Sequence, residues 1–134
     1  MKSGNKLFIV EDDVNVLYSL QNKFSMEEFN VNTDTGNSRI ESIVTKIKLF
    51  QPDYIILDLL LPRIDGFELM RSIRTDENTN NIPIFVFTNL SDQDSKARCE
   101  QLGAEQIFIK DDFSVDAFIE KVMKIIENKN KQKK

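Results

Sequence analysis

The chain has 134 residues, the length of one domain with a substantial core. Its 22 acidic residues outnumber its 18 basic ones and leave a net charge of −4, so direct DNA binding is not expected. One cysteine, Cys99, and no histidine exclude an internal disulfide, zinc sites built from several Cys and His, and Ser–His–Asp or Cys–His catalysis. Neither a signal-peptide pattern nor a long apolar run is found, so a cytoplasmic location without membrane contact is expected.

Short apolar runs alternate along the chain with segments of helical spacing. The runs predict strands at Leu7–Val10, Phe29–Thr35, Tyr54–Leu57, Ile82–Phe87 and Ile107–Ile109. The helical segments follow them at about 14–24, 40–50, 67–73, 91–103 and 114–126. Apolar strands that alternate with helices favour a parallel sheet covered on both faces. We therefore predict a doubly wound α/β domain with five strands and five helices.

Polar residues predict where several of these helices begin and end. Asp13 and Asp65 are helix-start residues, and Ser38 opens a capping-box pattern. Ser91 is expected to cap the fourth helix, which should stop at Gly103.

The end of the chain differs in composition from the rest. Residues 129–134 hold four lysines and no acidic residue, and we expect them to form a basic, disordered tail. The domain itself is placed at residues 1–128. An ordinary start at Met1 and the basic tail favour a complete stand-alone protein, and an excised domain of a longer protein is the alternative.

Chemically reactive side chains stand where four of the predicted strands end. They are Glu11 and Asp12, Asp58, Thr88 and Lys110. Each alone is more simply a turn or capping residue, but ligands of such sheets bind at the carboxyl ends of the strands, where these residues converge. Clustered carboxylates need a cation, and oxygen ligands suit Mg²⁺, which also binds phosphate oxygens. A carboxylate beside Mg²⁺ can act as a nucleophile toward a phosphoryl group.

The same residues resemble the receiver domains of two-component response regulators, over residues 6–127. Ile9–Asp13 is similar to the acidic cluster of the family, and Asp58–Gly66 is similar to its phosphoacceptor segment Asp-x-x-x-Pro-x-x-Asp-Gly. Thr88 and Lys110 complete the ordered set. The resemblance implies a flavodoxin-like fold with strand order 2-1-3-4-5.

The resemblance also implies a phosphorylation chemistry. Asp58 would accept a phosphoryl group from a phosphohistidine of a sensor histidine kinase or of a histidine phosphotransfer protein. Mg²⁺ would be the cofactor, with Asp12, Asp58 and the carbonyl of Leu60 as ligands and Glu11 acting through water. The chain would then be no enzyme in the ordinary sense, although it would take part in its own phosphorylation and dephosphorylation.

Two further roles and an output surface follow from the resemblance. Thr88 would donate a hydrogen bond to the phosphoryl group, and Lys110 would pair with it. The face made by the fourth helix, the fifth strand and the fifth helix would change shape on phosphorylation. Here it draws on residues 91–102, 107–109 and 114–127, and it would contact an unidentified downstream protein or a second copy of the chain.

Four departures from the family pattern occur, one of them the apolar Leu60 and Leu90 beside the expected path of an attacking water, from which a long-lived aspartyl phosphate is expected. Asp111 follows Lys110 where the family usually has proline, so a trans peptide bond and a rebuilt loop are expected. Ile107 occupies the position of the family's switch aromatic, and the neighbouring Phe108 is expected in the core. Asn89 is larger than the usual residue after the threonine and is expected to narrow access to the acceptor. The acidic pair at 111–112 is expected to compete with phosphate for the lysine.

Two other functions stay open. A receiver fold that no longer signals by phosphate would serve as an interaction scaffold, and the departures at Asn89, Ile107 and Asp111 motivate this alternative. A Mg²⁺-dependent phosphohydrolase is the second alternative, although Glu11–Asp13 lacks the Asp-x-Asp pattern common in such enzymes. Mg²⁺ binding tests the first alternative, and turnover of a phosphate ester tests the second.

Overall fold

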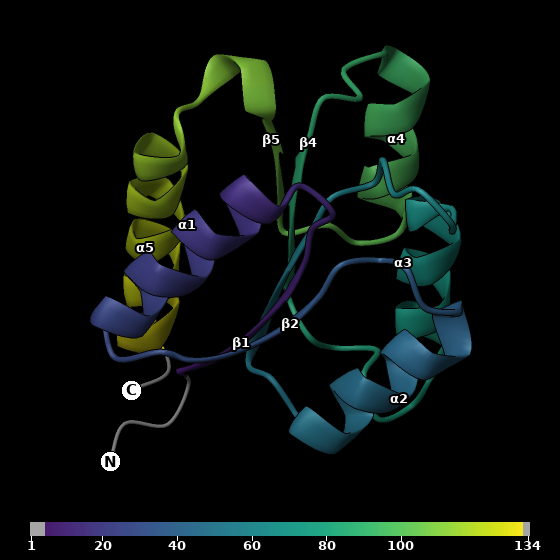
Figure 1. Cartoon of the computed structure of the whole chain (residues 1–134), viewed down its shortest axis with the longest axis horizontal. Coiled ribbons are helices and arrows are strands. Elements are labelled where there is room, and N and C mark those ends of the chain that lie inside the picture. Colours follow the sequence, from purple (N-terminus) through teal and green to yellow (C-terminus); the bar gives the residue numbers. More distant parts are fainter. Residues whose placement is uncertain (1–4, 133–134) are drawn as a thin grey trace.

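Five parallel strands form one sheet in the order β2-β1-β3-β4-β5 in the computed structural model, which describes residues 5–132 (Figure 1). The strands are β1 (Lys6–Val10), β2 (Asn30–Asp34), β3 (Tyr54–Leu57), β4 (Ile84–Thr88) and β5 (Gln106–Ile109). Every neighbouring pair in the sheet is parallel. The predicted doubly wound sheet and its strand order are therefore confirmed.

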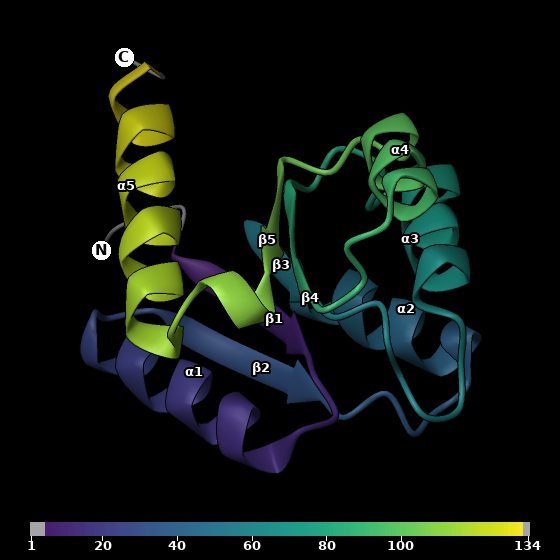
Figure 2. The ribbon, with the colours of Figure 1, turned by 90° about the horizontal axis from the view of Figure 1, so that it is seen from above.

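Helices cover both faces of this sheet. They are α1 (Val14–Met26), α2 (Ile40–Phe50), α3 (Gly66–Thr75), α4 (Gln93–Gln101) and α5 (Val115–Gln132), with a short 3₁₀ helix, η1, at Lys110–Asp112. Figure 2 shows α1 and α5 on one side of the sheet and α2, α3 and α4 on the other. Within the described range, no helix has the length and apolar character needed to cross a membrane.

Alternate residues of each strand supply the two cores. On β1, Leu7 and Ile9 pack toward α1 and α5, whereas Phe8 and Val10 pack toward α2 and α3. Because both faces are buried, β1, β3 and β4 are apolar almost throughout. The edge strand β2 pairs only with β1 and is correspondingly more polar.

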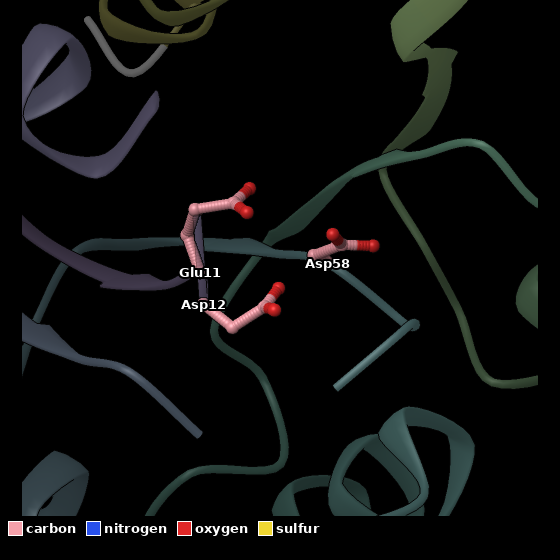
Figure 3. Close-up of side chains that lie close together, drawn as sticks. All are labelled: Glu11, Asp12 and Asp58. Carbon is pink, nitrogen blue, oxygen red and sulfur yellow. The ribbon is translucent and has the colours of Figure 1, made fainter. Parts of the chain in front are cut away.

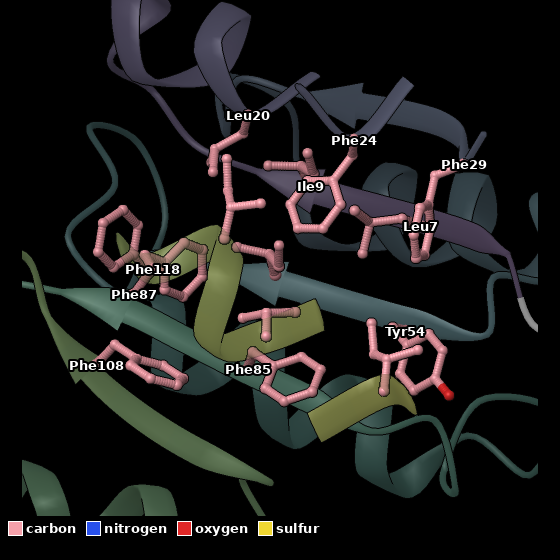
Figure 4. Packing of buried hydrophobic residues seen from close by; sticks show 14 of the residues in the cluster. Leu7, Ile9, Leu20, Phe24, Phe29, Tyr54, Phe85, Phe87, Phe108 and Phe118 are labelled. Atoms are coloured by element: carbon pink, nitrogen blue, oxygen red, sulfur yellow. The ribbon is translucent and has the colours of Figure 1, made fainter. Parts of the chain in front are cut away.

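The core under α1 and α5 is rich in aromatic rings (Figure 4). Phe87 stacks on Phe118 with ring centroids 3.9 Å apart, and Phe108 meets the same ring edge-on at 5.0 Å. Phe108 is 1% exposed, which confirms its predicted place in the core. The core under α2, α3 and α4 is mainly aliphatic.

Two helix starts differ from the sequence predictions. Asp13 caps α1 as predicted, but α2 begins after Arg39 without a side-chain cap, so the cap expected at Ser38 is absent. The cap of α4 is Asp92 in place of Ser91. A capping oxygen must reach an amide two or three residues further on, and the Asp92 carboxylate accepts such a bond at 3.1 Å.

The last helix is longer than expected. It continues to Gln132, so residues 129–132 are helical and the predicted disorder does not apply to them. Lysine is a good helix former and is favoured at a helix C-terminus, where it offsets the helix dipole. Lys129 also pairs with Glu105 at 3.2 Å. Residues 133–134, the rest of the predicted tail, lie outside the described residues, as do residues 1–4.

Candidate phosphoryl-acceptor site

Side chains from the ends of β1 and β3 point toward one another at the carboxyl edge of the sheet. Figure 3 shows the carboxylates of Glu11, Asp12 and Asp58 converging there. Glu11 is 1% exposed and Asp58 is 4% exposed, whereas Asp12 is exposed. Each strand is fixed by the two-sided core behind it, so the position of the strand end decides where the carboxylate lies.

Lys110 reaches this cluster from the end of β5. Its ammonium lies 2.7 Å from Asp58 Oδ2 and 2.9 Å from Glu11 Oε1. Backbone amides also hold these carboxylates, because Leu60 N–H donates to Asp58 Oδ1 at 3.0 Å and Asp13 N–H donates to Glu11 Oε2 at 3.1 Å, an oxygen that Lys110 also contacts at 3.0 Å. The two buried carboxylates are therefore fully hydrogen-bonded and oriented.

Burial sets the ionisation of this group. It raises the pKa of Glu11 to about 7, although the hydrogen bond and charge of Lys110 act in the opposite direction. Burial alone would lower the pKa of Lys110, but its hydrogen bonds to Asp58 and Glu11 outweigh this effect and raise it. Lys110 is therefore a cation over the physiological pH range.

The three carboxylates fit a small divalent cation. One oxygen from each of Glu11, Asp12 and Asp58 lies within 4.8 Å of the others. One ammonium cannot balance three carboxylates, and the ligand atoms are all oxygens, as Mg²⁺ prefers. The acidic cluster predicted from the sequence is thus present in the structure.

Thr88 ends β4, which lies between β3 and β5 in the sheet. Its strand therefore separates the strand that leads to Asp58 from the strand that leads to Lys110. Thr88 is fully buried, and its hydroxyl oxygen accepts a long hydrogen bond from Leu90 N–H at 3.4 Å. Among residues 5–132 the hydroxyl donates no hydrogen bond, so its hydrogen can serve a bound group.

The loop after β3 is short and tied back on itself. Leu60, whose carbonyl the resemblance makes a metal ligand, forms an isolated antiparallel bridge with Asp65. Asp65 caps α3 by accepting the Phe67 N–H at 2.8 Å, which confirms its predicted role as a helix-start residue. This loop fixes the backbone that follows Asp58.

The departures after Lys110 have a different outcome from the one expected. Asp111 and Asp112 are exposed in η1 and form no ion pair with Lys110, so that prediction is wrong. The ammonium turns inward because the carboxylates there are buried, and ion pairs are stronger where water is excluded. The predicted trans bond between Lys110 and Asp111 is confirmed, since no peptide bond of the described residues is cis.

One contact was not foreseen from the sequence. The side-chain oxygen of Asn89 accepts a hydrogen bond from the backbone N–H of Asp111 at 2.9 Å. Positions 89 and 111 are both departures from the family pattern. That both positions depart from the pattern could have suggested a contact between them. Whether they lie close together depends on how β4 and β5 pair.

Comparison with known proteins identifies the family. The family model of the response regulator receiver domain matches residues 7–123, so the chain belongs to this family. Response regulator ArlR of Staphylococcus aureus is 30% identical over 122 residues, which cover 90% of this chain and 52% of that protein. Sensory transduction protein BceR of Halalkalibacterium halodurans is 28% identical over 121 residues, with 90% and 49% covered. The chain thus spans about half the length of these curated relatives.

Solved structures show the same fold. A CheY-like response regulator receiver domain protein from Methanospirillum hungatei has a TM-score of 0.81 at 18% identity, covering 97% of this chain and 99% of that one. The non-phosphorylated HemR receiver domain of Leptospira biflexa has a TM-score of 0.79 at 23% identity, with 90% and 93% covered. At these identities the likeness supports the fold alone.

Proposed function

We propose that the chain is a two-component receiver that accepts a phosphoryl group on Asp58 from a phosphohistidine of a sensor histidine kinase or of a histidine phosphotransfer protein. The observation that carries the proposal is the state of Asp58. Its buried carboxylate is oriented by a backbone amide and an ammonium, beside two further carboxylates. An aspartate that only caps a strand or turn does not need a buried ammonium and two neighbouring carboxylates.

Mg²⁺ completes the proposed site. Glu11, Asp12, Asp58 and the carbonyl of Leu60 would hold it, Glu11 acting through water, and the ion would supply positive charge opposite the transferring phosphoryl oxygens. The charge surplus of the three carboxylates supports this assignment.

The transfer itself is a displacement at phosphorus. A carboxylate oxygen of Asp58 bonds to phosphorus as the bond to the donor's imidazole nitrogen breaks, and the imidazole departs with the bonding electrons. Lys110 moves from the carboxylate to a phosphoryl oxygen, and Thr88 donates its hydroxyl hydrogen to another. The chain supplies orientation and charge and is itself the phosphorylated product, so we do not class it as an enzyme.

The output is proposed to pass through the face formed by α4, β5 and α5. Thr88 leads into α4 and Lys110 leads from β5 into α5, so both phosphoryl-contacting residues are joined directly to this face. A downstream protein or a second copy of the chain would be the partner. The proposal further includes a cytoplasmic location and no direct contact with DNA or membrane.

The experiment is the intact mass of the full chain after incubation with acetyl phosphate and Mg²⁺. Wild type is expected to gain one phosphoryl group, and the gain should be lost with a chelator or in Asp58→Asn. Asp53→Asn is a matched control, because Asp53 is a second aspartate beside β3 but lies at its opposite end.

The alternatives predict other results. A folded wild type that gains no mass and does not bind Mg²⁺ would favour the phosphate-independent scaffold. Continued hydrolysis of a generic phosphate ester would favour the phosphohydrolase.

A further inference from the structure

We propose that Asn89 is a positioning residue, whose side chain latches the loop carrying Thr88 to the loop carrying Lys110. This inference rests on the proposed function, because it assigns the latch a purpose in phosphoryl transfer. Its direct partner is the backbone N–H of Asp111, which donates to Asn89 Oδ1 at 2.9 Å.

The latch begins where the sheet ends. The last aligned pair of β4 and β5 is Thr88 with Ile109. Beyond this pair the two chains separate, one toward α4 and the other into η1. The bond from Asn89 to Asp111 connects the two chains one step past the sheet, on the far side of the residues that would contact the phosphoryl group.

At residues 89 and 111 themselves, neither loop is held by buried side chains. Residues 89 and 111–112 are exposed, and α4 buries only Cys99. Within η1 the Phe113 N–H reaches the Lys110 carbonyl at 3.4 Å, a long bond. Pairing in the sheet fixes Thr88 and Ile109, and Leu90 and Phe113 pack against the two cores further along each chain. Residues 89 and 111 lie between these supports and are exposed, and the Asn89 side chain connects them directly.

The two departures from the family pattern form one chemical pair. Proline at position 111 would have no N–H to donate, so the latch requires a different residue there. An amide at position 89 provides the acceptor without adding another carboxylate beside the exposed Asp111 and Asp112. The hydrogen bond therefore requires both a side-chain acceptor at position 89 and a residue with a backbone N–H at position 111.

Lys110 has to change partners during transfer. In the structure its ammonium lies between Asp58 and Glu11. It must turn to a phosphoryl oxygen while its backbone stays at the edge of the site. A latch on the next residue keeps that backbone in place, so the movement is confined to the flexible side chain.

The first test needs no phosphorylation. In ¹⁵N-labelled full chain, Asn89→Ala should speed hydrogen exchange of the Asp111 amide about three- to tenfold, the value of one ordinary hydrogen bond. Asn89→Asp keeps an acceptor at the same reach and should retain most of the protection. Asp111→Ala keeps the backbone N–H and should retain protection at position 111. Ser91→Ala, at an exposed position on the same loop, is the matched control.

The second test connects the latch to transfer. Asn89→Ala should lower the rate of phosphorylation by acetyl phosphate about three- to tenfold while leaving Mg²⁺ affinity unchanged, because the acidic cluster lies on β1 and β3. Asn89→Asp should recover part of the rate, and Ser91→Ala should match wild type.

Three results would overturn the latch. The first is an exchange rate of the Asp111 amide that does not change with the residue at position 89. The second is an equal phosphorylation rate for Asn89→Ala and wild type. The third is a loss of Mg²⁺ affinity that parallels the loss of phosphorylation rate. Failure of wild type to be phosphorylated would instead remove the proposed function, and with it the latch's role in transfer, while the amide exchange would still report whether the hydrogen bond exists.

Discussion

The helices α3 and α4 lie side by side on the same face of the sheet, yet they are held very differently (Figure 2). α3 buries five of its ten residues, whereas α4 buries one of its nine. Gly66, at the start of α3, lies so close to the chain that a Cβ there would come within 2.5 Å of the Leu59 backbone. The helix α4 contains no glycine.

This difference separates the two halves of the site. The strand that carries Asp58 leads into a firmly docked helix, so the acceptor carboxylate has a fixed backbone. The strand that carries Thr88 leads into a weakly docked helix, so the loop beyond it depends on individual hydrogen bonds. The backbone after Asp58 is therefore held by more buried side chains than the backbone after Thr88.

Arg74 of α3 provides much of what holds the far end of α4. Its guanidinium donates to the carbonyls of Leu102 at 2.8 Å, Gly103 at 3.0 Å and Ile82 at 2.8 Å. These carbonyls belong to the chain after α4 and the chain before β4. The side chain thus fixes the end of α4 remote from the site and leaves the Thr88 end less constrained.

The largest expected effect comes from removing core volume under α3. Ile73 is fully buried, so Ile73→Ala should lower the free energy of unfolding by about 2–5 kcal/mol. Cys99→Ala, at the buried position of α4, removes less volume and should cost about 1 kcal/mol. Urea unfolding measures both, and similar losses from the two substitutions would erase the contrast between the helices.

A smaller loss is expected at the Arg74 contact. Arg74→Ala leaves several carbonyls without a donor and should cost about 2 kcal/mol in urea unfolding. Arg74→Lys should recover little of this loss, because a single ammonium cannot reproduce the planar fork of donors. Arg71→Ala is the control, because Arg71 is exposed and its ion pair with Glu68 is 3.7 Å long. A loss at Arg74 no larger than at Arg71 would contradict the role given to this contact.

The most delicate measurement is the reactivity of Cys99, which reports opening of α4. Burial raises the pKa of this thiol from 9.0 to about 11, so its thiolate fraction near pH 8 is about a hundredfold below that of the unfolded chain. Native protein should therefore react slowly with a thiol reagent at pH 8. Because the folded pKa is the higher one, the contribution of this group to stability is lost as pH rises from 9 toward 11.

The labelling result also tests the comparison. If α4 opens locally, labelling should proceed at urea concentrations well below those that unfold the protein. Cys99→Ala, which has no thiol, gives the background rate. Labelling that begins only with global unfolding would mean that α4 is held as firmly as α3.

Much of the fold could be predicted because its causes are local. The apolar runs at Leu7–Val10 and Tyr54–Leu57 are strands buried on both faces, and their pattern shows this without knowledge of their partners. The polar residue that follows each run then falls at the carboxyl edge of a parallel sheet, so Asp58 and Lys110 were candidate site residues. Helix starts were less accurate, because Ser91 and Asp92 offer equally suitable capping groups.

The sequence alone therefore determined the class of fold and the residue types gathered at one edge of the sheet. Only the tertiary structure decided how those residues pair. Lys110 pairs with Glu11 and Asp58, which are 99 and 52 positions away, and not with the aspartates beside it in the sequence. Asn89 meets Asp111 across 22 positions. Such contacts depend on strand order, register and burial together, and none of these is encoded in the neighbourhood of a single residue.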